Sequence, residues 1–130
     1  MVGSGLILSP HFAFAGSSGQ EILRVGLIGL GLRGTNHLKN LLLRDDISIA
    51  AICDIDPVRV DLNLELIQKA GQKKPRVFGK NDYDYRNLLE LKDLDAVIIS
   101  TPWEWHVPMA VDAMKAGKYA GLEVSAATTM

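Results

Sequence analysis

The segment "RVGLIGLGLRG", Arg24 to Gly34, decides how this chain folds. It opens as an apolar run and closes with Gly29, Gly31 and Gly34 in the spacing G-x-G-x-x-G. An apolar run that ends in glycine is typical of a buried parallel strand. Between a strand and a helix, these glycines permit a tight turn, a close approach of the backbone to a diphosphate, and close helix–strand packing. The segment therefore predicts a strand, a phosphate-binding turn and a helix.

A carboxylate follows the next apolar run at the distance that a dinucleotide site requires. Asp54 comes directly after "ISIAAIC", Ile47 to Cys53, and about twenty residues beyond Gly34. An acid at this place accepts hydrogen bonds from the adenosine ribose hydroxyls and repels a 2′-phosphate, which favours NAD over NADP. Arg59 would soften that preference, but we expect it to fall within the following helix.

Strand-like and helix-like segments alternate along the rest of the chain. This alternation predicts an α/β fold, a Rossmann-type doubly wound parallel sheet with helices on both faces. Asp56 followed by Pro57 is typical of a helix start, and Gly71 and Gly117 of helix ends. The first predicted strand begins at Arg24, and the other four cover Ile47–Cys53, Arg76–Phe78, Ala96–Ser100 and Tyr119–Val124. The predicted helices include Thr35–Arg44, the segment after Asp56, "YRNLLEL" and the segment after His106.

Apolar residues recur at helical spacing in three of the predicted helices. Such a stripe indicates the face that packs on the sheet. The three stripes are Leu38, Leu41 and Leu42; Val58, Leu62 and Leu66; and Val107, Ala110, Val111 and Met114.

The composition suits one globular domain. The chain has 130 residues, 48% of them hydrophobic and 22% charged, and a formal net charge of -1. Nothing in this charge balance indicates a nucleic-acid or membrane partner. The single cysteine, Cys53, excludes an internal disulfide framework and a cysteine-based metal cluster, and we assign no metal site. Because Cys53 lies in an apolar run, we interpret it as a small core residue.

The first 22 residues differ in character from the rest of the chain, and we divide the chain into a leader, residues 1–22, and a dinucleotide-binding domain, residues 23–130. The leader contains a short apolar stretch and then Ala13-Phe14-Ala15, which is typical of a secretory signal peptide, although no basic segment precedes it. The alternative is a disordered or artificial leader. A signal peptide would imply export to the periplasm or beyond, and otherwise a cytoplasmic location is expected.

The segment "TPWEWH", Thr101 to His106, places both tryptophans of the chain at a predicted strand-to-helix turn. We expect Trp103 and Trp105 to point in opposite directions if the turn is extended, with at least one of them facing a cofactor and the other free to cap the core. His106 either contacts the ligand or caps the helix. Glu104 is electrostatically favourable near a helix start even without a ligand.

With these residues in view, the chain resembles the N-terminal domain of the Gfo/Idh/MocA family over residues 24–129. The resemblance is carried by "GLGLRG", "AICDIDP", "STPWEWH" and "GKYAGLEV". The family's fifth strand typically ends in Glu-Lys-Pro, whereas this chain has Glu123, Val124 and Ser125. "PWEWH" together with Glu-Val looks similar to a narrower branch, glycoside hydrolase family 109, whose founding activity is α-N-acetylgalactosaminidase.

The resemblance implies which residues contact NAD. Beyond the glycines of the loop, the implied contacts are Leu32, Arg33, Asp54, Trp103, Glu104, Trp105, His106, Glu123 and Val124. No catalytic residue is assigned.

The resemblance also implies the activity of a longer protein. Enzyme-bound NAD would oxidise the sugar at C3, elimination at C1 would follow, and water addition and re-reduction would complete a hydrolysis. The alternatives are an NAD-dependent sugar or polyol dehydrogenase and a non-catalytic NAD-binding fragment. Enzymes of the family carry a second domain that presents the sugar or glycoside and the catalytic residues, and a homo-oligomer could form through that domain. We therefore expect this chain to bind NAD without turning over by itself.

Overall fold

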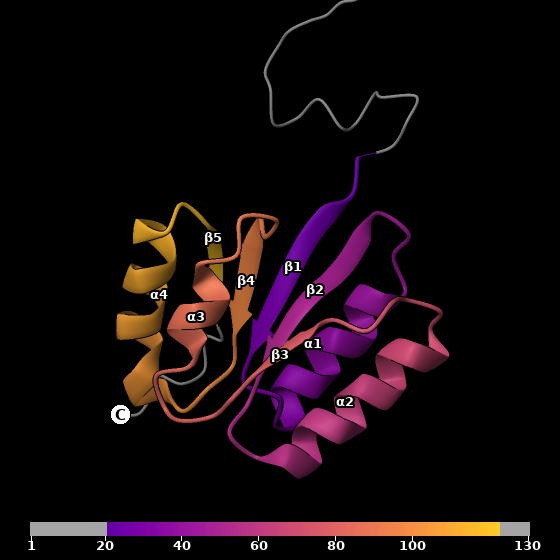
Figure 1. The fold of residues 1–130 in the computed structure, drawn as a ribbon, viewed down its shortest axis with the longest axis horizontal. Coiled ribbons are helices and arrows are strands. Elements are labelled where there is room, and N and C mark those ends of the chain that lie inside the picture. Colours follow the sequence, from indigo (N-terminus) through magenta and orange to yellow (C-terminus); the bar gives the residue numbers. More distant parts are fainter. Residues whose placement is uncertain (1–20, 123–130) are drawn as a thin grey trace, which may run out of the picture.

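A computed structural model describes residues 21–122, and within them the chain forms a five-stranded parallel sheet with helices on both faces (Figure 1). The sheet order is β3-β2-β1-β4-β5. The strands are β1 (Leu23–Ile28), β2 (Ile47–Cys53), β3 (Arg76–Phe78), β4 (Ala96–Ile99) and β5 (Tyr119–Leu122). The helices are α1 (Leu32–Leu42), α2 (Pro57–Lys69), α3 (Tyr85–Leu89) and α4 (His106–Lys115), with a 3-10 helix η2 (Trp103–Trp105) before α4.

The strand order confirms the predicted Rossmann-type fold. From the central β1 the chain crosses to β2 and β3 on one side and later returns to β4 and β5 on the other. The order therefore reverses between β1 and β4, and in open parallel sheets ligands bind at the carboxyl ends of the strands at such a point. The predicted glycine turn lies there, because it follows β1 directly.

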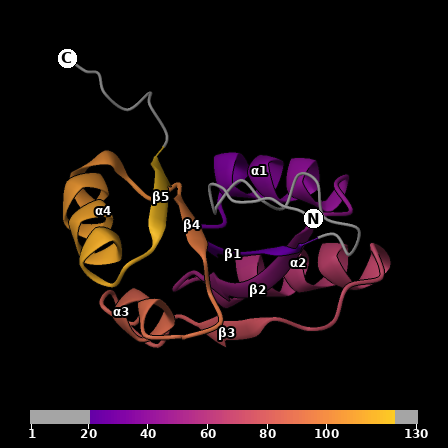
Figure 2. The ribbon, with the colours of Figure 1, turned by 90° about the horizontal axis from the view of Figure 1, so that it is seen from above.

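Two apolar layers hold the helices on the sheet. α1 and α2 cover one face with a cluster that includes Leu27, Leu38 and Ile67, and α3 and α4 cover the other with a cluster that includes Ile28 and Leu88. Figure 1 shows the two helix pairs on opposite sides of the strands, and Figure 2 shows α4 beside β5 at one end of the molecule. Leu27 and Ile28 belong to different layers because successive strand residues point to opposite faces.

Most predicted boundaries are confirmed. β2 and β3 have the predicted bounds, and Asp56 caps α2, since its side chain accepts a hydrogen bond from Val58 N at 2.9 Å. Gly71 and Gly117 follow α2 and α4 with φ of 84° and 80°, which are left-handed values that favour glycine after a helix.

The start of α1 differs from the prediction. The helix begins at Leu32 rather than Thr35, with Gly31 as its N-cap, so the second half of the glycine motif is already helical. Described residues of β5 end at Leu122, and Glu123 and Val124 lie outside the described part of the chain. The predicted leader lies outside it as well, apart from Glu21 and Ile22.

Two of the three predicted helix faces are only partly right. On α4 the buried residues are His106, Met109, Ala110 and Ala113, while Val107 and Met114 are 69% and 60% exposed. The stripe has the predicted spacing but lies one residue earlier, which is a rotation of about 100° about the helix axis. On α2 the buried residues are Val60, Asn63 and Ile67; of the predicted stripe, Leu66 packs against the core, whereas Val58 and Leu62 are exposed. The α1 face, by contrast, is confirmed: Leu38 is buried, and Leu41 and Leu42 pack beside it.

Cys53 is a core residue, as predicted. It is 6% exposed, and burial raises the pKa of its thiol to about 12. Between residues 21 and 122 no helix is long and apolar enough to cross a membrane. No group of three or more side chains of the metal-binding types lies together in that same range.

Candidate functional site

A cavity of about 230 Å³ lies at the carboxyl edge of the sheet, where the strand order reverses. It collects residues from the ends of β1, β2 and β4, from the loop before α3 and from α2 and α4. The lining residues are Ile28, Gly29, Gly31, Cys53, Asp54, Ile55, Arg59, Asn81, Asp82, Tyr85, Thr101, Pro102, Trp105 and Met109.

The glycine turn allows two backbone segments to approach more closely than side chains permit. Gly29 has φ of 96°, and a Cβ there would lie 2.8 Å from the carbonyl carbon of Ser100. A Cβ on Gly34 would collide with the carbonyl oxygen of Gly29. The turn therefore holds β1, α1 and the end of β4 together, and this is the close packing that the motif predicts.

The N-terminus of α1 opens beside this turn. Its N-cap, Gly31, has no side chain, and no side-chain hydrogen bond caps the helix among the residues that the structure describes. The first N–H groups of a helix and its dipole favour an anion. The side chains of Leu32 and Arg33 are exposed and do not line the cavity.

Asp54 ties the glycine turn to the start of α2. Its Oδ2 accepts a hydrogen bond from Leu30 N at 2.7 Å, and its Oδ1 accepts one from Asp56 N at 2.9 Å. A carboxylate has about four acceptor sites, so each oxygen retains capacity for a ligand hydroxyl. Sequence reasoning assigned Asp54 to a ribose and did not foresee that it also shapes the loop.

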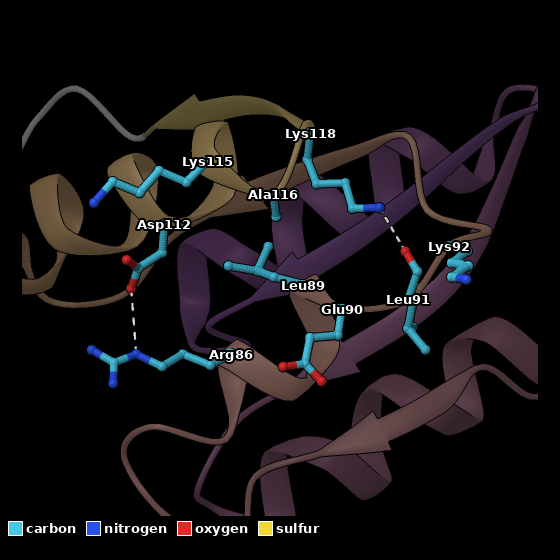
Figure 3. A pocket seen from close by; sticks show the side chains of 9 residues that line it. All are labelled: Arg86, Leu89, Glu90, Leu91, Lys92, Asp112, Lys115, Ala116 and Lys118. Carbon is cyan, nitrogen blue, oxygen red and sulfur yellow. Dashed lines mark hydrogen bonds and ion pairs between the residues drawn. The ribbon is translucent and has the colours of Figure 1, made fainter.

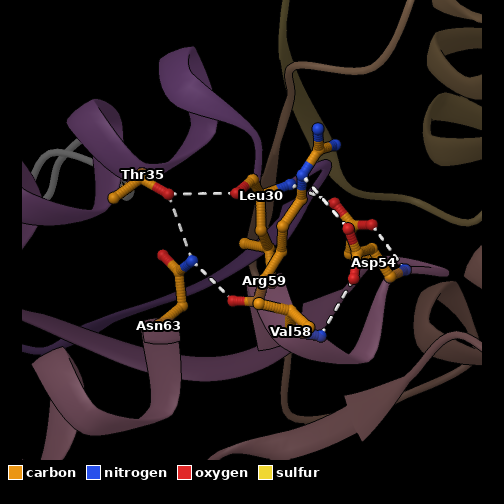
Figure 4. Close-up of polar contacts among 7 residues, drawn as sticks. Leu30, Thr35, Asp54, Val58, Arg59 and Asn63 are labelled. Carbon is orange, nitrogen blue, oxygen red and sulfur yellow. Dashed lines mark hydrogen bonds and ion pairs between the residues drawn. The ribbon is translucent and has the colours of Figure 1, made fainter. Parts of the chain in front are cut away.

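A second set of hydrogen bonds supports the turn from behind, as Figure 4 shows. Thr35 Oγ1 donates to Leu30 O at 3.0 Å, and the amide nitrogen of Asn63 donates to Thr35 Oγ1 at 3.1 Å and to Arg59 O at 2.8 Å. Asn63 is fully buried between α1 and α2. The turn is thus held on both sides before any ligand arrives.

The "TPWEWH" segment is not extended: Trp103 to Trp105 form the 3-10 helix η2. The two tryptophans lie in different surroundings. Trp105 lines the cavity and packs edge-on against Tyr83 and Tyr85, with ring centroids 5.5 and 6.4 Å apart. Trp103 is 67% exposed and does not line the cavity.

His106 is the buried N-terminal residue of α4. Its Nε2 lies 2.8 Å from Thr101 O, so the ring closes the turn between β4 and α4. Within the described residues no side-chain hydrogen bond caps α4, so this contact differs from the helix cap that the sequence suggested, and the ligand contact stays a prediction. Glu104 is exposed in η2 and does not line the cavity.

Sequence reasoning missed the wall of the cavity after β3. Asn81 and Asp82 line the cavity there, and buried Asp84 shapes their loop. Asp84 Oδ2 accepts hydrogen bonds from Gly79 N at 2.6 Å and Lys80 N at 2.9 Å, and these bonds, together with one from Asn87, hold the pKa of its carboxyl below the usual range. The sequence signal that could have found this wall is the polar cluster "GKNDYD" directly after a strand.

A wider groove of about 500 Å³ lies away from this edge, between the ends of α3 and α4 and the residues that precede β5 (Figure 3). It opens toward the amino ends of the strands, and Lys118 Nζ donates to Leu91 O across it at 2.6 Å. Ligands of open parallel sheets bind at the opposite edge, so this groove is not the candidate site.

The groups at the carboxyl edge fit a dinucleotide. A glycine turn at a helix N-terminus offers N–H donors to a diphosphate, and the Asp54 carboxylate offers acceptors to sugar hydroxyls. Half-buried Trp105 supplies an apolar wall beside them.

Comparisons with known proteins agree with this geometry. A family model described as the Gfo/Idh/MocA oxidoreductase family, NAD-binding Rossmann fold, matches residues 23–124. The chain is 47% identical over 110 residues to an alpha-N-acetylgalactosaminidase of Shewanella oneidensis, covering 85% of this chain and 24% of that protein. It is 43% identical over 110 residues to a glycosyl hydrolase family 109 protein of Stenotrophomonas maltophilia, covering 83% of this chain and 24% of the relative. The chain thus spans about a quarter of the curated relatives it matches.

Solved structures with the same fold include two with bound cofactor. One is scyllo-inositol dehydrogenase from Lactobacillus casei with NAD(H) and scyllo-inositol, with a TM-score of 0.64, 25% identity and coverage of 82% of this chain and 31% of that one. The other is a 3-ketoreductase from Actinomadura kijaniata with NADP and TDP-benzene, with a TM-score of 0.66, 25% identity and coverage of 83% and 30%.

Proposed function

The chain belongs to the Gfo/Idh/MocA oxidoreductase family and is its NAD-binding domain, and from this premise we propose how it holds the cofactor. The diphosphate lies over the turn from Gly29 to Gly34, and the adenosine ribose lies on Asp54. The observation that carries this placement is that the glycine turn and the Asp54 carboxylate line one cavity and are joined by the hydrogen bond from Leu30 N.

The other residues predicted to contact NAD have different roles in this proposal. Leu32 and Arg33 act through their backbone N–H groups in the first turn of α1. Trp105 forms an apolar wall that excludes water from the cavity, and His106 keeps the turn after β4 in shape through Thr101. Trp103 and Glu104 extend that wall from its exposed side.

Glu123 and Val124 are proposed to contact the cofactor from the carboxyl end of β5. This strand pairs with β4 in parallel, and its last described residue, Leu122, pairs with Ile99. The described end of β5, Leu122, therefore lies at the same edge of the sheet as the turn after β4.

For the longer protein of which such a domain is part, we propose NAD-dependent glycoside hydrolysis. The support is the 47% identity to an alpha-N-acetylgalactosaminidase. Bound NAD supplies a hydride acceptor that takes a hydride from the sugar and returns it. The substrate would then be a glycoside presented by a second domain, which could also form a homo-oligomer.

A sugar or polyol dehydrogenase is the second candidate, because an inositol dehydrogenase shares the fold with a TM-score of 0.64. The two candidates differ in what accumulates. A glycosidase recycles its cofactor and releases free sugar without NADH, whereas a dehydrogenase produces NADH in proportion to substrate oxidised. Absorbance of NADH together with sugar release, measured on the full-length enzyme with a panel of N-acetylhexosaminides, decides between them.

The binding proposal itself is tested by calorimetry of this chain with NAD. We expect saturable one-to-one binding that the Asp54→Ala substitution weakens by about tenfold or more, because the ribose loses its acceptor and the turn loses its anchor. Well-folded wild-type chain that takes up no NAD would overturn the proposal.

A further inference from the structure

The diphosphate of a dinucleotide is anionic, so an arginine beside the glycine turn would stabilise it. Arg33 lies inside the glycine motif, yet its side chain does not line the cavity. Arg59, which comes from the first turn of α2, does line it. Among the described residues that line this cavity, Arg59 is the only lysine or arginine.

The guanidinium of Arg59 lies directly against the glycine turn. A Cβ on Gly31 would be in ordinary van der Waals contact with the guanidinium, 3.4 Å from Arg59 Nη1 and 3.7 Å from its Cζ, so the arginine packs beside the turn at this position. Figure 4 shows the Arg59 side chain extending from α2 on the side of the turn where Asp54 lies. A cation from α2 thus lies next to the backbone of the glycine turn.

This guanidinium is held loosely enough to change partners. Its Nε lies 3.6 Å from Asp56 Oδ2, longer than a charge-assisted hydrogen bond, and the side chain is 54% exposed. The helix start positions it, because Asp56 caps α2 and Asn63 holds the Arg59 carbonyl. Arg59 is therefore fixed at its backbone and free to move at its tip.

The charges around the cavity favour such a cation. Asp54 and Asp82 line the cavity, and Asp56 lies beside it, so an incoming diphosphate meets three carboxylates. The helix N-terminus contributes only about half a positive charge. A guanidinium forms paired hydrogen bonds with phosphate oxygens and offsets this repulsion.

We propose that Arg59 is the residue that binds the cofactor diphosphate from α2, exchanging its contact with Asp56 for the phosphate oxygens when the dinucleotide binds. This inference rests on the proposed placement of NAD over the glycine turn. A 2′-phosphate is the less favoured target, because its place beside the ribose is the one that Asp54 occupies with a carboxylate.

The test compares two matched substitutions in this chain, Arg59→Ala and Arg44→Ala. Arg44 is a suitable control because it is 59% exposed and also pairs with an aspartate near in sequence, Asp46 at 2.8 Å, but does not line the cavity. Affinities for NAD, ADP-ribose, NADP and adenosine are measured by calorimetry and by NMR titration. Circular dichroism checks that both variants keep the fold.

We expect Arg59→Ala to weaken NAD and ADP-ribose binding by about 10- to 100-fold, with adenosine unchanged, because adenosine lacks the diphosphate. The dependence of NAD affinity on salt should also decrease, since a charge contact is lost. Arg59→Lys should restore part of the affinity, and Arg44→Ala should change none of these values beyond about twofold.

Three outcomes overturn the inference. NAD affinity that is unchanged in Arg59→Ala excludes a diphosphate contact. A loss that is confined to NADP assigns Arg59 to a 2′-phosphate. An equal loss for adenosine and NAD shows that Arg59 only supports the fold of the cavity. If wild-type chain binds no NAD at all, the proposed function fails first and the role of Arg59 falls with it.

Discussion

The glycine turn after β1 and the tryptophan turn after β4 lie at the same edge of the sheet but are built in different ways. The glycine turn depends on backbone: a positive φ at Gly29, the absence of a Cβ at Gly34 and an N–H group, that of Leu30, that donates to Asp54. The tryptophan turn depends on side-chain packing, with Trp105 against two tyrosines and His106 against a carbonyl.

The difference explains why one turn could be understood from sequence and the other only in part. A backbone requirement leaves a residue-type signature, because only glycine satisfies it. A packing requirement leaves a weaker one, because which of two tryptophans turns inward depends on partners distant in sequence, here Tyr83 and Tyr85. Substitutions in the two turns should therefore change the free energy of unfolding by different amounts.

The largest effect should come from Gly34→Ala. The new methyl group would collide with the Gly29 carbonyl, so β1 and α1 must move apart, at a cost of about 3 kcal/mol or more in unfolding free energy. Urea unfolding measures it. Gly117→Ala is the control: its φ of 80° is strained for alanine but nothing lies within 4 Å, so about 1 kcal/mol is expected. Equal costs at both positions would contradict the close approach at the turn.

Asp54→Ala should cost about 2 to 3 kcal/mol in unfolding free energy. The substitution leaves Leu30 N and Asp56 N without their acceptor in a partly buried site. Hydrogen exchange of these two amides provides the specific readout, since both should exchange faster while amides in β4 keep their protection. Unaltered exchange at Leu30 would show that Asp54 does not anchor the turn.

Trp105→Ala should cost about 2 kcal/mol, less than a fully buried tryptophan because this side chain is only half-buried. The chain has two tryptophans, so fluorescence reports on this turn alone. Trp103→Phe leaves Trp105 as the sole emitter, and NAD should quench it because it lines the cavity. The prediction fails if quenching survives in Trp105→Phe and disappears in Trp103→Phe.

Asp84→Asn tests the wall of the cavity after β3, which belongs to neither turn. Because the folded-state pKa of Asp84 lies below its unfolded value, its carboxylate stabilises the fold above the unfolded pKa of about 4, and this contribution disappears as the pH falls through the folded pKa. The variant should be about 1.5 kcal/mol less stable at pH 7, since backbone N–H groups lose a charged acceptor. Unfolding at pH 7 and at about pH 3 should show the gap closing; a gap that is constant with pH would contradict the assignment.

Trp103→Ala should produce the smallest change, within about 0.5 kcal/mol of wild-type stability, because the side chain is 67% exposed. Thermal unfolding of Trp103→Ala and Trp105→Ala side by side gives the comparison. A larger loss at Trp103 than at Trp105 would reverse the assignment of the two rings.

Much of this edge could be predicted from residue types alone. Gly29, Gly31, Gly34 and Asp54 lie in order at the ends of β1 and β2, and the strands alternate with helices as the apolar runs indicate. These features depend on local backbone requirements and on spacing along the chain, which a single sequence contains. The family resemblance adds the prediction that the tryptophan turn contacts the cofactor.

Tertiary structure decided the rest. The stripe on α4 has the helical spacing expected, yet the sheet buries His106 and Met109 and leaves Val107 exposed, because a shift of one residue turns the helix by about 100° and only packing selects the angle. In the same way, Arg59 rather than Arg33 lines the cavity. Spacing along the chain does not show that the start of α2 packs beside the turn after β1, so this contact could not be predicted. Sequence by itself determined which backbone shapes are permitted, and the packed sheet determined which side chains meet.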